Sequence, residues 1–485
     1  MSFDHPSATD PASHARGLYI GGRWLPGGGI PVMDPATGRV LAEVPDAGIS
    51  EAAAAVDAAA AAAAGWRAMP TRQRAEILRR WFTLFTERAE EFARLISLEN
   101  GKALPDARGE VAYAAEFFRW YAEEAVRVPG EYRTAPSGAH RILVDHEPIG
   151  ICVLITPWNF PAAMATRKIA PALAAGCTVI LKPASETPLT AYAMAALGEE
   201  AGVPPGVVNV LTTTQPGPVV EAMLADPRVR KLSFTGSTGV GRTLLAGAAR
   251  TVASCSMELG GNAPFLVFDD ADLEAALDGA MIAKMRNAGE ACTAANRFYV
   301  QGGIHDAFVE GLAQRMAALQ VGPGTAEGVQ VGPMITAKAV EKIDRLVADA
   351  LARGAALVTG GAPLAGEGFF YPPTVLRDVP RDAALAQEEI FGPVAPVFRF
   401  ETEDEAVRMA NDTEYGLAAY VYSRDLGRAM RVGGRIESGM IGINRGLMSD
   451  PAAPFGGVKQ SGLGREGGVH GILEFMEPKY YAVNL

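Results

Sequence analysis

Four short segments of the sequence carry residue types that could act together on a carbonyl compound. Cys292 offers a thiol nucleophile, Glu258 a carboxylate that could activate water, and Asn159 an amide that could donate to an oxyanion. The fourth segment, Gly236-Ser-Thr-Gly-Val-Gly241, contains the glycines of a phosphate-binding turn. Together these groups suit the covalent oxidation of an aldehyde with the help of a nicotinamide cofactor.

The surroundings of Cys292 distinguish it from the other cysteines of the chain. Cys152, Cys177 and Cys255 each lie within an apolar, strand-like run, where burial makes a thiol inert. Cys292 lies instead among Gly, Glu and Asn residues, in a stretch where a turn of the backbone can expose the sulfur. A buried structural thiol is the alternative interpretation of this residue.

Glu258 and Asn159 each have a catalytic and a structural interpretation. Glu258 precedes the pair Gly260-Gly261, and paired glycines let the backbone approach a ligand closely. As a general base, Glu258 would need partial desolvation and a raised pKa, whereas the alternative is a solvated carboxylate at a strand end. Asn159 lies between two prolines, where an Asx turn is the alternative to an oxyanion donor.

Two strand ends could bind a dinucleotide. The turn at Gly236 lies between a strand and a helix, which is the geometry that holds phosphate, although its spacing is not GxGxxG and an ordinary tight turn is the alternative. Lys182 and Ser185 follow another strand, at the position where such folds read the adenosine ribose. A positive lysine beside a small neutral serine can accept a 2′-phosphate, although Glu186 is adjacent and an exposed lysine is the alternative.

Apolar strand-like runs alternate with helix-like stretches after residue 150, which predicts a parallel sheet covered by helices on both faces. The expected strands are 151–155, 178–181, 208–211 and 231–234, and the expected helices are 161–175, 187–202, 217–225 and 239–249. A second alternation predicts another α/β domain, with strands at 265–267, 298–300, 418–422 and 441–443 and helices at 271–287, 304–319 and 424–433.

The N-terminal and C-terminal regions differ from this alternating pattern. We expect no regular structure in residues 1–17, short strands at 18–20 and 40–44, and helices at 50–64, 71–98 and 105–125. The tail Pro478–Leu485 resembles a strand that could pair with another element or another subunit.

Composition narrows the possible partners. The 485 residues are 49% hydrophobic and carry a net charge of -11, so a nucleic acid is an unfavourable partner and an anionic substrate would need a local basic pocket. The four cysteines form no CxxC pair, which indicates reduced thiols and a cytoplasmic protein. We expect no membrane span, because no run of about 18 apolar residues occurs. We expect no metal site, because the sequence contains no cluster of Cys and His residues.

The motifs taken together resemble the aldehyde dehydrogenase superfamily from about Tyr19 to Tyr481. The matching segments, in the order and spacing of the family, are Pro157-Trp-Asn-Phe-Pro161, Lys182-Pro-Ala-Ser185, Phe234-Thr-Gly-Ser237, Glu258-Leu-Gly-Gly261, Gly289-Glu-Ala-Cys292, Glu389-Ile-Phe-Gly-Pro393 and Pro454-Phe-Gly-Gly457. The resemblance implies an α/β fold with a Rossmann-type cofactor domain (1–122 and 147–260), an α/β catalytic domain (261–469) and an oligomerisation arm (123–146 and 470–485) that builds homodimers or homotetramers.

The resemblance also implies roles for the site residues. Cys292 would attack the aldehyde, Asn159 and the Cys292 backbone N–H would hold the oxyanion, and Glu258 would activate the water that hydrolyses the thioester. The residues implied in cofactor binding are Thr156, Trp158, Lys182, Ser185, Gly236, Ser237, Glu389 and Phe391. Lys182 with Ser185 favours NADP, with NAD as the alternative.

Succinate-semialdehyde dehydrogenases are the branch that the chain resembles most. In that branch two arginines and a serine grip the distal carboxylate of the substrate, and the positions assigned here are Arg167, Arg297 and Ser449, with Phe455 beside them. A guanidinium fork matches a carboxylate. The alternatives are a structural ion pair for Arg297 and a solvated helix face for Arg167.

Two positions near the nucleophile depart from that branch, and other functions compete. Glu290 stands where the branch often has Gln, and it could raise the thiol pKa or face solvent. Ala294 replaces a second cysteine, so a redox disulfide with Cys292 cannot form. Alternative substrates are glutarate semialdehyde or an uncharged aldehyde, and alternative classes are a CoA-acylating dehydrogenase, a non-catalytic protein or a cysteine hydrolase. None of the six histidines lies near a motif, which disfavours a hydrolase.

Overall fold

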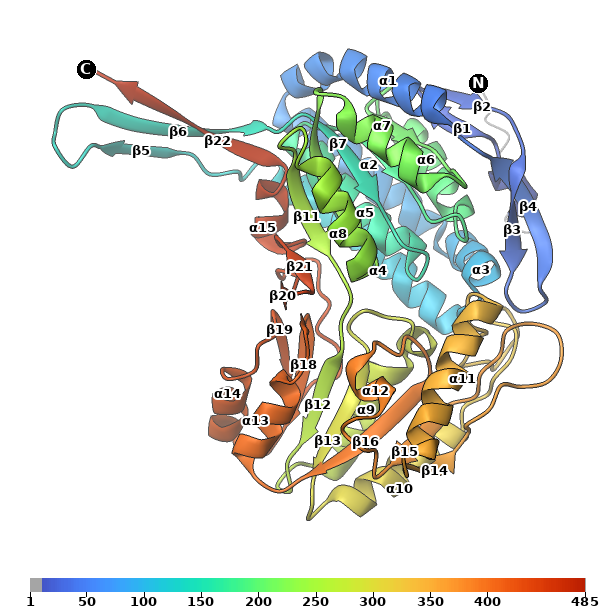
Figure 1. Ribbon diagram of the computed structural model, residues 1–485. Helices are drawn as coiled ribbons and strands as arrows, with labels where there is room; N and C mark the ends of the chain where they lie inside the picture. The colour runs from blue at the N-terminus through green and yellow to red at the C-terminus, as the bar shows by residue number, and fades with distance from the viewer. Residues whose placement is uncertain (1–10, 485) are drawn as a thin grey trace.

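The structure is a computed structural model that describes residues 11–484, folded around two sheets with a projecting arm (Figure 1). In this range the first sheet has eight strands in the order β2-β1-β9-β8-β7-β10-β11-β21. Its strands are β1 (Leu18–Ile20), β2 (Arg23–Leu25), β7 (Ile151–Ile155), β8 (Thr178–Lys182), β9 (Val208–Val210), β10 (Val229–Thr235), β11 (Ser254–Glu258) and β21 (Gly462–Leu463).

The central strands of the first sheet are parallel and covered by helices, as the apolar runs predict. β7 pairs in parallel with β8 and β10, and all five of its residues are buried. The helices of this part are α1 (Ile49–Ala68), α2 (Thr71–Glu87), α3 (Ala89–Asn100), α4 (Leu104–Glu124), α5 (Pro161–Ala175), α6 (Leu189–Ala201), α7 (Pro216–Ala225) and α8 (Thr238–Ala248). The predicted α5 and β7 are confirmed at both ends.

The second sheet forms the lower part of Figure 1, with the order β14-β15-β16-β13-β12-β18-β19. Its strands are β12 (Ala263–Val267), β13 (Ala295–Gln301), β14 (Ala356–Thr359), β15 (Thr374–Arg377), β16 (Val394–Phe400), β18 (Ala418–Tyr422) and β19 (Met440–Ile443). The helices are α9 (Leu273–Met285), α10 (His305–Ala317), α11 (Ala337–Ala352), α12 (Ala384–Gln387), α13 (Glu403–Asn411) and α14 (Leu426–Gly433).

The arm is a three-stranded antiparallel sheet that extends away from the rest of the chain (Figure 1). β5 (Glu131–Thr134) pairs with β6 (Arg141–Pro148), and β6 pairs with β22 (Met476–Val483) from Met476 opposite Pro148 to Val483 opposite Arg141. The strand-like tail predicted from the sequence therefore pairs within its own chain. The short helix α15 (Gly468–Leu473) precedes β22.

The remaining elements are two small antiparallel strand pairs and two 3₁₀ helices. They are β3 (Gly29–Asp34) with β4 (Arg39–Pro45), β17 (Tyr415–Gly416) with β20 (Val458–Lys459), η1 (Pro11–His14) and η2 (Arg286–Gly289). No helix of residues 11–484 is long and apolar enough to span a membrane.

The structure differs from the sequence prediction at several places, and it also contains elements that were not predicted, among them α11, β16 and α13. The helix expected at 71–98 is two helices, because Arg88 leaves helical geometry with φ -105° and ψ 22° and its side chain pairs with Glu200 at 2.7 Å. Pro11–His14 forms a 3₁₀ turn with His14 buried, so the absence of structure expected for residues 1–17 is wrong there, and residues 1–10 lie outside the described range. β21, from the range 261–469, joins the first sheet by pairing with β11.

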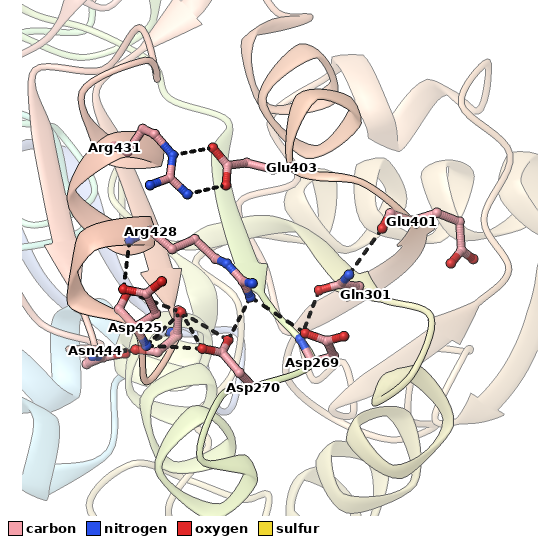
Figure 2. A network of polar contacts seen from close by, with 10 residues as sticks. Asp269, Asp270, Gln301, Glu401, Glu403, Asp425, Arg428, Arg431 and Asn444 are labelled. Carbon is pink, nitrogen blue, oxygen red and sulfur yellow. Dashed lines mark hydrogen bonds and ion pairs between the residues drawn. The ribbon is translucent and has the colours of Figure 1, made fainter.

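A polar network fills the carboxyl edge of the second sheet, where open α/β sheets ordinarily bind ligands (Figure 2). Asp270, which follows β12, accepts from Arg428 Nη1 at 3.0 Å and from the Ser423 hydroxyl at 2.9 Å. Arg428 also lies 3.6 Å from Asp269, and Asn444 after β19 donates to Ser423 O at 3.0 Å. These groups satisfy one another, and the motif residues Asn262 and Cys292 lie at the opposite edge, before β12 and β13.

Candidate active site

The proposed nucleophile Cys292 lies between η2 and the amino end of β13. The loop before it turns sharply, because Asn287 and Ala288 both have a φ of 52°. Gly261, at the start of β12, approaches this loop so closely that an added Cβ would lie 2.4 Å from the Cys292 carbonyl oxygen. The paired glycines after Glu258 thus serve the contact between the two catalytic segments.

Charged groups of both signs surround the Cys292 thiol. Burial above all raises its pKa, which reaches about 12; Arg167 and Arg286 act to lower the pKa, and the charges of Glu389 and Glu258 act to raise it. The resting residue at neutral pH is therefore a protonated thiol, and the reaction needs a base that removes its proton.

Glu258 is the carboxylate whose burial and hydrogen bonding best fit such a base. It ends β11 and is buried, and burial, followed by the charge of Glu466, raises its pKa well above the usual range. Arg167 and Lys168 act in the opposite direction. Its Oε2 atom has no hydrogen-bond partner among the described residues. A desolvated carboxyl with a free oxygen has the properties of a general base.

A buried ion cluster lies next to Glu258. Glu466 pairs with both Arg167 and Lys168, which are consecutive residues of α5. Lys168 Nζ also donates to the Ser233 hydroxyl at 3.0 Å. Arg167 is therefore buried rather than part of a solvated helix face, and its guanidinium stacks over the Phe455 ring at 4.1 Å.

Asn159 directs its side chain at the nucleophile loop. Nδ2 donates to the carbonyl oxygen of Glu290 at 3.0 Å, and Oδ1 has no partner within residues 11–484. Because an amide nitrogen has two hydrogens, one remains for a substrate oxygen. This arrangement places a donor beside Cys292 without any rearrangement of the loop.

The carboxyl of Glu290 is shielded from solvent and forms no ion pair within residues 11–484. It is buried and accepts the Ile335 amide at 3.2 Å, and burial raises its pKa to about 8, although the charge of Lys102 acts to lower its pKa. The solvent-facing alternative from the sequence is therefore wrong. At neutral pH Glu290 is mainly a neutral acid, which removes most of its electrostatic effect on the thiol.

The strand–turn–helix segment at Gly236 has a geometry that fits a phosphate. Ser237 caps the N-terminus of α8 by accepting the Val240 amide at 3.5 Å, and Gly236 donates to the Glu258 carbonyl oxygen at 3.0 Å. A Cβ on Gly236 would lie 2.5 Å from the Phe234 ring, so the turn has no room for a side chain. The amides at the start of α8 are suited to an anion.

The residues expected at the adenosine ribose lie at the end of β8, next to the end of β7. Lys182 is buried with Nζ 3.0 Å from the Pro183 carbonyl oxygen, and Ser185 donates to Thr213 O at 3.1 Å. Thr156 follows β7 and its amide donates to Lys182 O at 3.2 Å. Glu186 is exposed beside them.

At the other end of this row, Glu389 Oε1 accepts the Gly261 amide at 3.0 Å, and burial raises the Glu389 pKa to about 7. Phe391 has a φ of 58° and packs edge-on against Trp158 with ring centroids 5.4 Å apart. The phosphate turn, a hydroxyl-binding carboxylate and an aromatic wall are the parts that a nicotinamide dinucleotide requires.

Arg297 is not brought to this cluster. Its guanidinium is 1% exposed and donates to the carbonyl oxygens of Asn262, Met409 and Ala410 and to the Tyr299 hydroxyl, at 2.9–3.2 Å. The substrate contact expected for Arg297 is therefore wrong in this structure, where its guanidinium binds backbone carbonyl oxygens. Ser449 lies in the loop after β19 and is partly buried.

Arg286 is the residue that the sequence analysis missed. Its guanidinium lies 4.7 Å from the Phe160 ring and 5.9 Å from the Tyr113 ring, and its charge acts on Cys292. No carboxylate pairs with it in the described part of the chain. The available signal was its place in the nucleophile loop, where a solvated or functional arginine is more readily accommodated than in the interior of a strand.

Tyr113, on α4, was also missed. Its hydroxyl is buried without a hydrogen-bond partner among residues 11–484, and the charges of Arg167 and Arg286 both act on it. The same range contains no group of three or more His, Cys, Asp or Glu side chains that could hold a metal ion. The site is thus a thiol, a base, an amide donor and two arginines.

Comparisons with known proteins agree with this geometry. Residues 24–481 match the aldehyde dehydrogenase family. A succinate-semialdehyde dehydrogenase of Paenarthrobacter nicotinovorans is 56% identical over 92% of this chain and 99% of that protein. A glutarate-semialdehyde dehydrogenase of Pseudomonas aeruginosa is 51% identical over 95% of this chain and 96% of that protein. The crystal structure of succinate-semialdehyde dehydrogenase from Burkholderia pseudomallei superimposes with a TM-score of 0.96 at 52% identity, over 100% of both chains.

The chain therefore belongs to the aldehyde dehydrogenase family, and the fold expected from its motifs is confirmed. Within that family it is an NAD(P)-dependent aldehyde dehydrogenase similar to the succinate-semialdehyde dehydrogenases.

Proposed function

We propose that the protein oxidises succinate semialdehyde to succinate, with Arg167 and Arg286 facing the distal carboxylate of the substrate. The observation that carries this proposal is the position of Arg286, a cation whose charge acts on Cys292 and which forms no ion pair with a carboxylate within residues 11–484, although Asp106 also feels its charge. A cation held against aromatic rings is only partly solvated, so an anionic ligand would gain a strong interaction there.

The relatives support an anionic substrate but not one particular compound. Their names denote succinate semialdehyde, glutarate semialdehyde and 3-sulfolactaldehyde, and identity to this chain reaches 56% for the first and is 50–51% for the second and 51% for the third. All three compounds carry an aldehyde at one end and an anionic group at the other. Glutarate semialdehyde is the alternative substrate, because one additional methylene changes the binding free energy by only about 1–3 kcal/mol.

The proposed reaction uses Cys292, Asn159 and Glu258 in turn. Glu258 takes the thiol proton, and the Cys292 sulfur adds to the aldehyde carbon while the Asn159 amide and the Cys292 N–H stabilise the oxyanion. A bound nicotinamide supplies the hydride acceptor, and a thioester on Cys292 results. Glu258 releases the first proton to solvent and then accepts a proton from water, whose oxygen attacks the thioester carbon. The C–S bond breaks, Glu258 returns its proton to the departing Cys292 sulfur, and the acid product loses its own proton to solvent as the carboxylate.

We also propose NADP as the preferred cofactor, with NAD as the alternative. Lys182 supplies a cation at the strand end expected beside the adenosine ribose, and NADP appears in the names of a similar Escherichia coli succinate-semialdehyde dehydrogenase and of a similar crystal structure from that organism. The exposed Glu186 opposes this preference, because a carboxylate repels a 2′-phosphate.

A cytoplasmic homodimer or homotetramer is the expected assembly. The assembly is supported by the arm, whose strands β5 and β22 expose Tyr132, Tyr480 and Tyr481. The cytoplasmic location is supported by the four cysteines, which are all free thiols. Aromatic residues exposed on a protruding sheet are typical of contacts between subunits.

The test compares succinate semialdehyde with butanal, each with NADP and NAD, for the wild type, Arg286→Ala and Arg297→Ala. We expect Arg286→Ala to raise the KM for the semialdehyde by about 30-fold or more, because it removes one partner of a buried charge pair, and to leave butanal kinetics unchanged. Equal use of both aldehydes, unaffected by Arg286→Ala, would refute the substrate proposal and leave the aldehyde dehydrogenase assignment intact.

A further inference from the structure

A buried lysine from a distant part of the chain, Lys102, donates a hydrogen bond to the backbone of Asn159, the proposed oxyanion donor. Lys102, between α3 and α4, has a fully buried side chain, and its Nζ lies 2.6 Å from the Asn159 carbonyl oxygen. The same nitrogen lies 4.0 Å from the ring of Phe160. This ammonium therefore contacts the backbone and the neighbour of the residue that would stabilise the oxyanion.

Glu110 fixes the lysine on its other side and also fixes α5. Its Oε2 atom lies 2.6 Å from Lys102 Nζ. Its Oε1 atom accepts the backbone amides of Ala162 and Ala163 at 2.9 and 3.2 Å, which satisfies two of the free N–H groups at the start of α5. Lys102 and Glu110 thus hold the segment 159–163 from both ends.

A second donor converges on the same carbonyl oxygen. Asn287 Nδ2 donates to Asn159 O at 3.0 Å and to Glu290 O at 3.1 Å. Glu290 O is also the acceptor of the Asn159 side chain. The main chain and the side chain of Asn159 are therefore both tied to the nucleophile loop, and the only charged donor in this arrangement is Lys102 within the described residues.

A structural ion pair alone would not require this geometry. A buried pair is costly to desolvate and is often replaceable by apolar groups without loss of stability. Here the Lys102 ammonium donates a hydrogen bond to the carbonyl oxygen of Asn159, the residue that carries the amide donor. Burial lowers the Lys102 pKa, and the charge of Glu110 counteracts this effect. The cost of burying a charge at this point is consistent with a need to fix Asn159.

We propose that Lys102 is a positioning residue for the oxyanion donor, whose buried ammonium, held by Glu110, fixes the Asn159 backbone so that its amide points at the substrate oxygen. This inference rests on the oxyanion role proposed for Asn159. A displacement of about 1 Å at a reacting group can reduce a rate about 100-fold, so the loss of Lys102 affects kcat much more than substrate affinity.

The test is a double-mutant cycle between Lys102→Met and Asn159→Ala in the full-length enzyme, read as kcat, KM for aldehyde and cofactor, and melting temperature. We expect each single variant to lower kcat about 100-fold with KM little changed. On the Asn159→Ala background, Lys102→Met should change kcat by less than about twofold, the usual error of additivity, because the group that it positions is gone.

The matched control is Lys231→Met, which removes another lysine with a buried side chain, paired with Glu474 at 3.0 Å. It should lower the melting temperature as Lys102→Met does and keep kcat. If Lys102→Met does not fold, the charge-free pair Lys102→Gln with Glu110→Gln is used in the same cycle. Normal kcat in the Lys102 variants, or multiplicative losses in the cycle, would overturn the proposal. Full activity of Asn159→Ala would instead refute the oxyanion role itself.

Discussion

The Gly261 amide donates to Glu389 Oε1 at 3.0 Å, which joins the segment that follows the proposed base Glu258 to the loop of the proposed ribose contact. The other carboxylate oxygen is left for a ribose hydroxyl. Because the Glu389 pKa is raised to about 7, by burial above all, the carboxylate form becomes dominant only as the pH rises from 6 to 8.

Glu389 should therefore make cofactor binding pH-dependent. An ionised carboxylate is the stronger acceptor, so the wild type should bind NADP more tightly at pH 8 than at pH 6. Glu389→Gln keeps an oxygen for Gly261 and should bind about tenfold more weakly at pH 8, with no change between the two pH values. Calorimetric titration measures both effects, and an unchanged pH dependence in the variant would assign the titration to another group.

Glu290 should make the folded state less stable as the pH rises. Its folded pKa of about 8 exceeds the usual value of 4.5, so between these values the folded state binds more protons than the unfolded state, and the free energy of unfolding falls. Glu290→Gln should stabilise the protein at pH 8 by on the order of a few kcal/mol and have little effect at pH 4.5. Urea unfolding at the two pH values measures this difference. Equal effects at both would contradict it.

Replacement of Glu258 should separate the two halves of the reaction. Glu258→Gln cannot accept the proton from water, so kcat should fall by about 100- to 10,000-fold. The thioester can still form slowly, because Cys292 can lose its proton to solvent. Mass spectrometry of the variant after incubation with aldehyde and NADP should therefore detect an acylated Cys292. Cys292→Ser, the control, should show no thioester adduct. An unmodified Cys292 in the Glu258 variant would show that acylation itself depends on this base.

Arg297 should matter for stability and not for substrate binding. Arg297→Met removes donors from three buried carbonyl oxygens, which should lower the free energy of unfolding by on the order of 3 kcal/mol. The KM for succinate semialdehyde should stay at the wild-type value. Urea unfolding and initial rates give the two quantities, with Arg286→Met as the counterpart expected to raise KM and keep stability. A large KM change in Arg297→Met would restore its original assignment.

The sequence predicted the alternating elements well because fully apolar strands and helical stretches have distinct local patterns. β7, α5 and β18 begin and end where the pattern does. The break at Arg88 was not predictable, because apolar residues such as Phe85 and Phe92 continue at a helical spacing across it. At that break Arg88 pairs with Glu200, which lies far away in the sequence.

The site shows the same division between local and long-range information. Cys292, Glu258 and Asn159 stand out because glycines and prolines surround them in recognisable motifs. The choice between Arg286 and Arg297 depends on how the left-handed turn at Asn287 and Ala288 directs the chain, which no periodicity reveals. Lys102 has no motif, since its contact with Asn159 spans 57 residues.

The pairing of β11 with β21 has a consequence for the synthesis of the protein. Glu258 lies opposite Gly462, so the strand that ends in the proposed base obtains its outer neighbour only from the last part of the chain. While the ribosome is still adding those residues, β11 is an open sheet edge, available to other unpaired strands. The strand of the proposed base is therefore complete only once residues 462 and 463 are present, and we expect a chain that stops before them to leave β11 with an unpaired edge.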